Sequence, residues 1–170
     1  MALRNLLNAE RIAILVLPRS RAAVLDEAAR LLARPGSGGT GSGRAWGEAP
    51  EPAMIRAIGA GLHERELAAS TAIGHGVAIP HARVEGIEQS RCAFLRLAVP
   101  VDFGAADGEP VDLVLALAEP AHHVQQHLEL LAELARMLAD PGYRSGLRGA
   151  VTIDLLRRRL LEGAGANPSS

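Results

Sequence analysis

Lysine is missing altogether from this sequence, so that all 18 basic residues are arginines. Aromatic side chains are also scarce, because the chain has one tryptophan, one tyrosine and two phenylalanines. So few rings argue against a platform on which the bases of single-stranded nucleic acid could stack. The formal net charge is −1 and the sequence pI is about 6.6, so no overall positive field attracts DNA or an anionic membrane. We therefore expect no nucleic-acid partner.

The chain has a single cysteine, Cys92, which excludes an internal disulfide framework and a metal site built from thiolates alone. Cys92 lies in the apolar run 92–95, and we interpret it as a small buried hydrophobic residue. No stretch reaches the roughly 18 apolar residues that a membrane-spanning helix needs. The short apolar segment 12–17 lacks the cleavage pattern of a signal peptide. These absences predict a cytoplasmic protein that is not embedded in a membrane.

What is present is the composition of one compact domain with an aliphatic core. The 170 residues are 48% hydrophobic and 22% charged, values that suit a folded domain of this size. Some segments repeat apolar residues at helical spacing, and others are short apolar runs typical of strands. The predicted helices are 20–34, 52–67, 121–139 and 152–161, and the predicted strands are 12–17, 92–99 and 111–118, with a further short strand within 69–83. Strands and helices are interspersed, which indicates an α/β or α+β domain with one sheet covered by helices.

Two segments are predicted to lie outside the folded core. Residues 34–52 are dominated by glycine, proline, serine and threonine, and we interpret them as a flexible surface insertion. Their glycines also invite comparison with a phosphate-binding loop, but the lysine that a nucleotide P-loop requires is absent. Residues 163–170 are predicted to be a disordered tail. Within the core, Asp107-Gly108 predicts a turn and the Asp-Pro-Gly sequence at 140–142 predicts the end of a helix.

Histidine is the residue type with the most chemical promise, and His81 is the first of two candidates. It follows Ile79-Pro80, where the proline ring fixes its own φ and restricts Ile79 to an extended conformation. A histidine held in this way just beyond the end of a strand, with Arg83 two residues on, suits a nucleophile or a ligand. The second candidate is His127. For the remaining four histidines we expect solvated surface positions, and these four are His63, His75, His122 and His123.

His127 is the second candidate, because it lies on the predicted helix 121–139. It shares a face with Leu131, Leu134 and Leu138, so we expect its ring to point inward. Two interpretations remain open from spacing alone. The ring is either a core histidine bonded to a carbonyl or a functional group that faces a site.

Two other kinds of site have weak support in the sequence. His123 and His127 have the i, i+4 spacing of a helical zinc site, but the residues between them, which include Gln125 and Gln126, lack the glutamate of an H-E-x-x-H motif. We therefore predict no metal. A hydrolase nucleophile elbow is unsupported, because Ser70 has no G-x-S-x-G context.

The segment 65–81 (RELAASTAIGHGVAIPH) closely resembles the phosphorylation-site signature of type-2 enzyme IIA domains. These domains belong to the bacterial phosphoenolpyruvate-dependent phosphotransferase system, and they include fructose and mannitol subunits and the nitrogen-regulatory enzyme IIA. The resemblance runs from about residue 3 to 162 and continues through PVDF at 100–103, DGEPVDL at 107–113, Glu119-Pro120, His127-Leu128 and LAD at 138–140. It implies a single α/β domain over residues 1–162, with a mixed β-sheet flanked by helices.

The resemblance also implies roles for individual residues. By position, His81 is the phosphoacceptor, with its reacting nitrogen unassigned, and His127 and Arg65 stabilise the phosphate. Ser70 and Thr71 are further candidates, as hydroxyl donors near the phosphate. Imidazole suits the acceptor role because its ordinary pKa of about 6.5 leaves a neutral ring nitrogen near neutral pH. Phosphoryl transfer mainly requires the protein to position the reacting groups and to stabilise the charge on the phosphoryl oxygens, so we expect no cofactor.

The implied donor is an HPr-like histidine phosphocarrier protein, and the branch of the family decides the partner downstream. A stand-alone chain of this length resembles the nitrogen-regulatory branch, whose members act by phosphorylation-dependent binding of other proteins. We favour that function. One alternative is a sugar-specific soluble enzyme IIA of the fructose or mannitol type that passes phosphate to a membrane transporter subunit. Another is a pure protein-interaction module without onward transfer.

Overall fold

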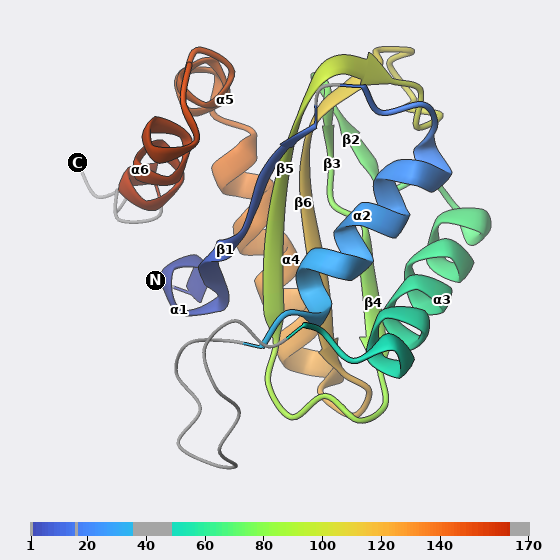
Figure 1. Cartoon of the computed structure of the whole chain (residues 1–170). Coiled ribbons are helices and arrows are strands. Elements are labelled where there is room, and N and C mark those ends of the chain that lie inside the picture. Colours follow the sequence, from blue (N-terminus) through green and yellow to red (C-terminus); the bar gives the residue numbers. More distant parts are fainter. Residues whose placement is uncertain (1, 16, 36–48, 164–170) are drawn as a thin grey trace.

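The computed structural model describes residues 2–15, 17–35 and 49–163, and Figure 1 shows how its helices and strands are arranged. In chain order the elements are α1 (Ala2–Leu6), β1 (Leu7–Leu15), α2 (Arg21–Ala33), α3 (Pro52–Ala68), β2 (Ala72–Gly74), β3 (Val77–Ala78), β4 (His81–Val84), β5 (Arg91–Val101), β6 (Val111–Pro120), α4 (Val124–Leu138), α5 (Pro141–Arg148) and α6 (Ile153–Gly163). Among the helices in these ranges, none is long and apolar enough to cross a membrane.

The strands form one mixed sheet. Its order is β1-β5-β6-β3-β2, and β4 also pairs with β6. β5 and β6 are antiparallel, whereas β1 runs parallel to β5, and β3 and β4 both run parallel to β6. β3 and β4 therefore follow one another along the same edge of β6, and β4 begins at His81. The expected mixed sheet flanked by helices is confirmed.

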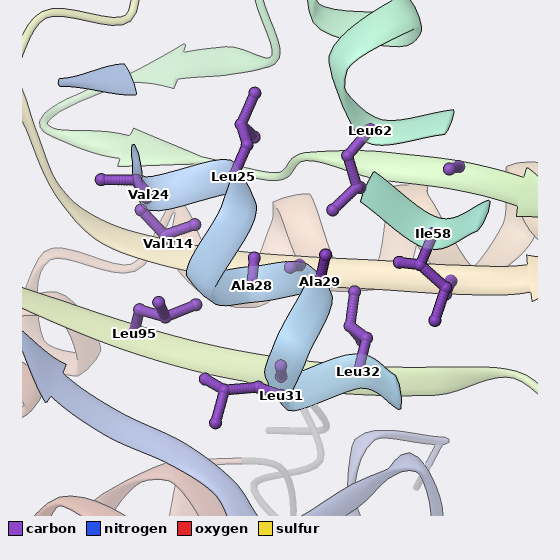
Figure 2. Packing of buried hydrophobic residues seen from close by; sticks show 14 of the residues in the cluster. Val24, Leu25, Ala28, Ala29, Leu31, Leu32, Ile58, Leu62, Leu95 and Val114 are labelled. Carbon is purple, nitrogen blue, oxygen red and sulfur yellow. The ribbon is translucent and has the colours of Figure 1, made fainter. Parts of the chain in front are cut away.

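Helices cover both faces of the sheet: α2 and α3 lie on one side and α4 on the other (Figure 1). On the first side, Ala28 of α2 and Ile58 of α3 belong to the same buried cluster as Leu95 of β5 and Val114 of β6 (Figure 2). On the second side, the opposite face of β6 packs with α4 through Leu113, Leu115, Leu117, Leu130, Leu134 and Leu138. Because both faces are buried, residues 113–118 of this strand appear in the sequence as an unbroken apolar run rather than an alternating one.

α3 approaches β4 closely, and a glycine makes this contact possible. A Cβ atom added to Gly61 would lie only 2.9 Å from the Cβ of Ala82, well inside the 3.5–4.0 Å at which carbon atoms pack best. Arg65 lies one turn further along α3, on the same side of the helix. The close approach at Gly61 therefore brings the last turn of α3 beside the start of β4.

Several helix boundaries agree with local signals in the sequence. α2 starts directly after Ser20, whose hydroxyl oxygen accepts a hydrogen bond from the amide of Ala23 at 3.1 Å. The predicted end of a helix at 140–142 is correct, but the same residues also begin α5, which we did not predict. Asp140 accepts a hydrogen bond from the amide of Tyr143 at 3.1 Å, and Pro141 occupies the first helical position.

Other boundaries differ from the predictions. The first strand begins at Leu7 rather than at residue 12, and the short helix α1 before it was not predicted. His81 follows the end of β3 at Ala78, as expected, but it is also the first residue of a further strand, β4, which was not predicted. Of the predicted insertion 34–52, residues 36–48 lie outside the described part of the chain. So do residues 164–170 of the predicted tail, whereas Gly163 is the last residue of α6.

Candidate functional site

His81 lies at the start of β4 with both ring nitrogens in defined contacts. Its Nδ1 is 2.8 Å from the carbonyl oxygen of Ile79. A carbonyl can only accept, so Nδ1 carries the proton and Nε2 keeps its lone pair. Nε2 accepts a hydrogen bond from Nε of Arg65 at 3.1 Å. The arrangement thus presents Nε2 as the nucleophilic nitrogen of a ring that the backbone holds in place.

The surroundings of His81 favour its neutral form. Burial lowers the pKa of this imidazole below its ordinary value of 6.5. The hydrogen bond to Ile79 acts in the opposite direction, and the positive charges of Arg65 and His127 lower the pKa further. A neutral ring with an unprotonated nitrogen is the form that can attack an electrophile.

Arg65 comes from the last turn of α3 and is fixed by a second contact. Its Nη1 donates to the carbonyl oxygen of Ala69 at 2.8 Å, just past the end of the helix. The guanidinium is therefore held by its own helix end on one side and by His81 on the other. It retains further N–H groups for an anionic ligand, since a guanidinium has five.

His127 lies beside His81 and belongs to the first turn of α4, which covers the face of the sheet opposite α3. Its ring is buried, and the centroids of the His81 and His127 rings are 5.2 Å apart, with a tilt of 50° between the ring planes. Its Nδ1 is in hydrogen-bond contact with the carboxylate of Glu119. The expectation of an inward-pointing ring is confirmed, and its partner is a carboxylate rather than a carbonyl.

The three residues singled out by the resemblance therefore meet at one edge of the sheet. Arg65 and His127 approach His81 from helices on the two opposite faces, and His81 contributes from the strand between them. The charge of Arg65, the N–H groups of the two helical side chains and a lone pair on His81 make an arrangement that can hold an anion and attack it. The described residues contain no group of three or more histidine, cysteine or acidic side chains placed to hold a metal ion.

Ser70 and Thr71 lie just after α3, but their hydroxyl groups already donate to protein acceptors. Ser70 Oγ donates to the carbonyl oxygen of Phe103 at 2.6 Å. Thr71 Oγ1 donates to a carboxylate oxygen of the buried Glu66 at 2.5 Å, and the Thr71 amide donates to the other oxygen at 3.2 Å. A phosphate contact would require these bonds to be exchanged, and it stays a prediction.

The remaining histidines have other surroundings. His63 pairs with Asp26 on α2 at 2.8 Å, and His75 occupies the turn between β2 and β3 with a φ of 55°. The rings of His122 and His123 contact each other, with centroids 4.4 Å apart. For this group the expected surface position agrees with their partial or full exposure.

Glu119 is the residue that sequence reasoning missed. It appeared only as part of the Glu119-Pro120 pair, with no role of its own. A usable signal existed, because an acidic residue that directly follows the apolar run 113–118 must find a partner or remain costly to bury. The sequence could not name that partner, since His127 belongs to a different element.

The fold and the site define a class of protein: an α/β domain in which a histidine at a sheet edge lies beside an arginine and a second histidine. Residues 5–162 match the family model of the phosphoenolpyruvate-dependent sugar phosphotransferase system, EIIA 2. The chain belongs to this family, as its sequence resemblance indicated.

Individual relatives agree with this assignment. A nitrogen regulatory protein from Pseudomonas aeruginosa is 39% identical over 137 residues, which are 81% of this chain and 80% of that protein. The crystal structure of nitrogen regulatory protein IIA-Ntr from Neisseria meningitidis matches with a TM-score of 0.76 and 30% identity, over 94% of this chain and 99% of that one. The IIA mannitol structure from Escherichia coli, at 21% identity, shares the fold with a TM-score of 0.66 over 91% of this chain and 98% of that one.

Proposed function

We propose that this protein accepts a phosphoryl group on Nε2 of His81 from the phosphohistidine of an HPr-like carrier protein in the cytoplasm. The observation that carries the proposal is the pairing of His81 Nδ1 with the Ile79 carbonyl, which leaves Nε2 as the one ring nitrogen with a lone pair. The sequence left the reacting nitrogen open, and this hydrogen bond supports Nε2.

In the transfer, the Nε2 lone pair of His81 attacks the phosphorus atom and forms a P–N bond. The bond between phosphorus and the carrier's histidine breaks, and that nitrogen takes back its electron pair. The N–H of Arg65 that now points at Nε2 turns to a phosphoryl oxygen as the new bond forms. Arg65 and His127 then share the negative charge on the equatorial oxygens. No metal ion or cofactor is needed for this balance.

Regulation of partner proteins by phosphorylation state is the activity we propose for the transferred group. A phosphoryl group adds about −1.5 to −2 charges near neutral pH on ordinary phosphoresidues, which is enough to change an interface. The 39% identity to a protein described as a nitrogen regulatory protein supports this branch of the family. The second candidate is transfer to a transporter subunit, which the family's description as a sugar phosphotransferase system supports.

The test is the uptake of labelled phosphate from phosphoenolpyruvate through the general transfer enzymes. Wild type should gain an acid-labile label, His81→Ala should gain none, and His127→Ala should be labelled more slowly. His63→Ala is the matched control, because His63 lies on the same helix as Arg65 but pairs with Asp26 of α2, and it should be labelled like wild type. Label on His81→Ala would refute the acceptor assignment, and phosphorus-coupled NMR of the ring would refute the Nε2 assignment if the phosphate were on Nδ1.

A chase separates the two downstream functions. The labelled protein is mixed with membranes and candidate sugars, and the label is followed. Retention of the label together with a changed affinity for a partner protein supports regulation. Appearance of the label on a sugar supports the transport subunit and refutes the regulatory proposal as the sole function.

A further inference from the structure

The C-terminal end of β6 places a carboxylate inside the protein. Glu119 is 1% exposed, and it is preceded by the apolar residues of the strand. In the pairing of β4 with β6, His81 is opposite Leu117 and Arg83 is opposite Glu119. Side chains two residues apart on a strand point to the same face. Glu119 therefore lies on the same side of the sheet as Leu117, which is the side that α4 covers.

Both oxygens of this carboxylate have partners. Oε2 is in hydrogen-bond contact with Nδ1 of His127, and Oε1 is 3.5 Å from the hydroxyl oxygen of Ser90. Burial of a carboxylate is costly unless it is paired with a charge or a hydrogen-bond donor. His127 is the titratable side chain in contact with this carboxylate. The contact therefore provides the carboxylate with a hydrogen-bond partner and also restricts the orientation of the histidine ring.

The contact determines which nitrogen of His127 can reach a ligand. An ionised carboxylate can only accept, so Nδ1 of His127 must carry a proton and its direction is fixed. Nε2 is then the nitrogen left for a phosphoryl oxygen, on a ring whose neighbour is His81 at 5.2 Å between centroids. When Nε2 is protonated as well, the ring is a cation whose charge Glu119 balances from behind.

We propose that Glu119 is a positioning residue for phosphoryl transfer: it holds His127 with Nδ1 toward the interior and Nε2 toward the phosphoryl group on His81. The proposal rests on the function proposed above. The His127 ring contacts Glu119 of β6 and His81 of β4. A carboxylate behind a functional histidine generally fixes its tautomer and orientation, and loss of such a partner lowers activity about 10- to 100-fold in metal sites.

The decisive variant is Glu119→Gln, which keeps the size of the side chain and removes its charge. We expect the rate of phosphoryl uptake by His81 to fall about 10- to 100-fold. Glu129→Gln is the matched control, since it removes the same charge from an exposed residue of α4 two positions beyond His127. Ser90→Ala is the second control, because it removes the weaker contact of the same carboxylate and leaves His127 in place. Both controls should stay within about twofold of wild type.

A double-variant comparison separates positioning from a general structural role. If Glu119 acts through His127, the change Glu119→Gln should alter the rate by no more than about twofold when His127 is already alanine. An undiminished loss in the His127→Ala background would overturn the proposal. A wild-type rate for the single variant Glu119→Gln would also overturn it.

A spectroscopic readout keeps the test independent of activity. In nitrogen-correlated NMR spectra of the full chain, His127 should show a proton bound to Nδ1 in wild type and a changed ring signature in Glu119→Gln. If wild type took up no phosphate, the proposed function would fail, while this readout would still decide whether Glu119 orients His127. If Glu119→Gln did not fold, Glu119→Asp would replace it, with the charge kept and the carboxylate withdrawn by one carbon. Its rate should be below that of wild type, and an unchanged rate and ring signature would refute the role.

Discussion

Gly61 controls how closely α3 lies to β4, and its replacement by alanine is the sharpest test of how the fold positions Arg65. The added Cβ would lie 2.9 Å from the Cβ of Ala82, whereas carbon atoms pack best at about 3.5–4.0 Å. α3 must then move away from β4 by about 0.6 Å or more. Arg65 is four residues further along the same helix, so its contact with His81 would lengthen from 3.1 Å to about 3.7 Å, which is outside hydrogen-bond range.

The energies follow from the same geometry. Alanine in place of glycine within a helix gains about 0.8–1 kcal/mol in the free energy of unfolding, and overpacking costs about 1–3 kcal/mol. Gly61→Ala should therefore range from nearly neutral to about 2 kcal/mol less stable than wild type. Gly59→Ala is the matched control in the same helix, because its added Cβ would meet Ala29 at 3.6 Å. It should be about 1 kcal/mol more stable than wild type.

Urea unfolding of the three proteins and their rates of phosphoryl uptake measure both effects. We expect Gly61→Ala to lose about tenfold in rate, because small displacements of a positioning group are costly in catalysis. Gly59→Ala should keep the wild-type rate. If Gly61→Ala were as stable as Gly59→Ala and took up phosphate at the wild-type rate, close packing at Gly61 would not be what places Arg65.

Two further predictions concern the groups around His81. Because burial, Arg65 and His127 hold the pKa of His81 below 6.5, its neutral form persists as the pH falls below 6.5, and NMR titration of the ring should show a midpoint below that of an unfolded control. By linkage, the unfolded chain takes up this proton first, so the His81 contribution lowers the stability as the pH falls from 6.5 to the native pKa and then levels off. A midpoint at or above 6.5 would contradict this. Thr71→Val removes the donor to the buried Glu66 carboxylate and should cost about 2 kcal/mol, more than Thr71→Ser, with the rate of phosphoryl uptake nearly unchanged. A large loss of rate in a stable Thr71→Val protein would instead favour a direct phosphate contact.

The segments that were predicted well are those whose signals are local. Ser20 marks the start of α2 because its hydroxyl caps the helix from a neighbouring position. The strands at 92–99 and 111–118 are confirmed within β5 and β6, since long apolar runs with two buried faces leave few alternatives. The residues at 140–142 show the limit of this approach. An Asp-Pro sequence is compatible both with the end of one helix and with the start of the next. Only the tertiary structure shows that α5 follows here.

In the candidate site, too, some features follow from local sequence and others depend on tertiary packing. The sequence by itself determined the presentation of His81, because Pro80 and the extended Ile79 restrict the backbone next to the histidine whatever the rest of the chain does. Only the tertiary structure decided which side chains meet it. Arg65 arrives because Gly61 lets α3 approach β4, and His127 arrives because α4 packs on the opposite face. The contact of His127 with the buried Glu119 likewise depends on the packing of α4 against β6. Backbone restraint acts between neighbours in the chain, whereas the contacts of a buried side chain depend on how distant elements pack.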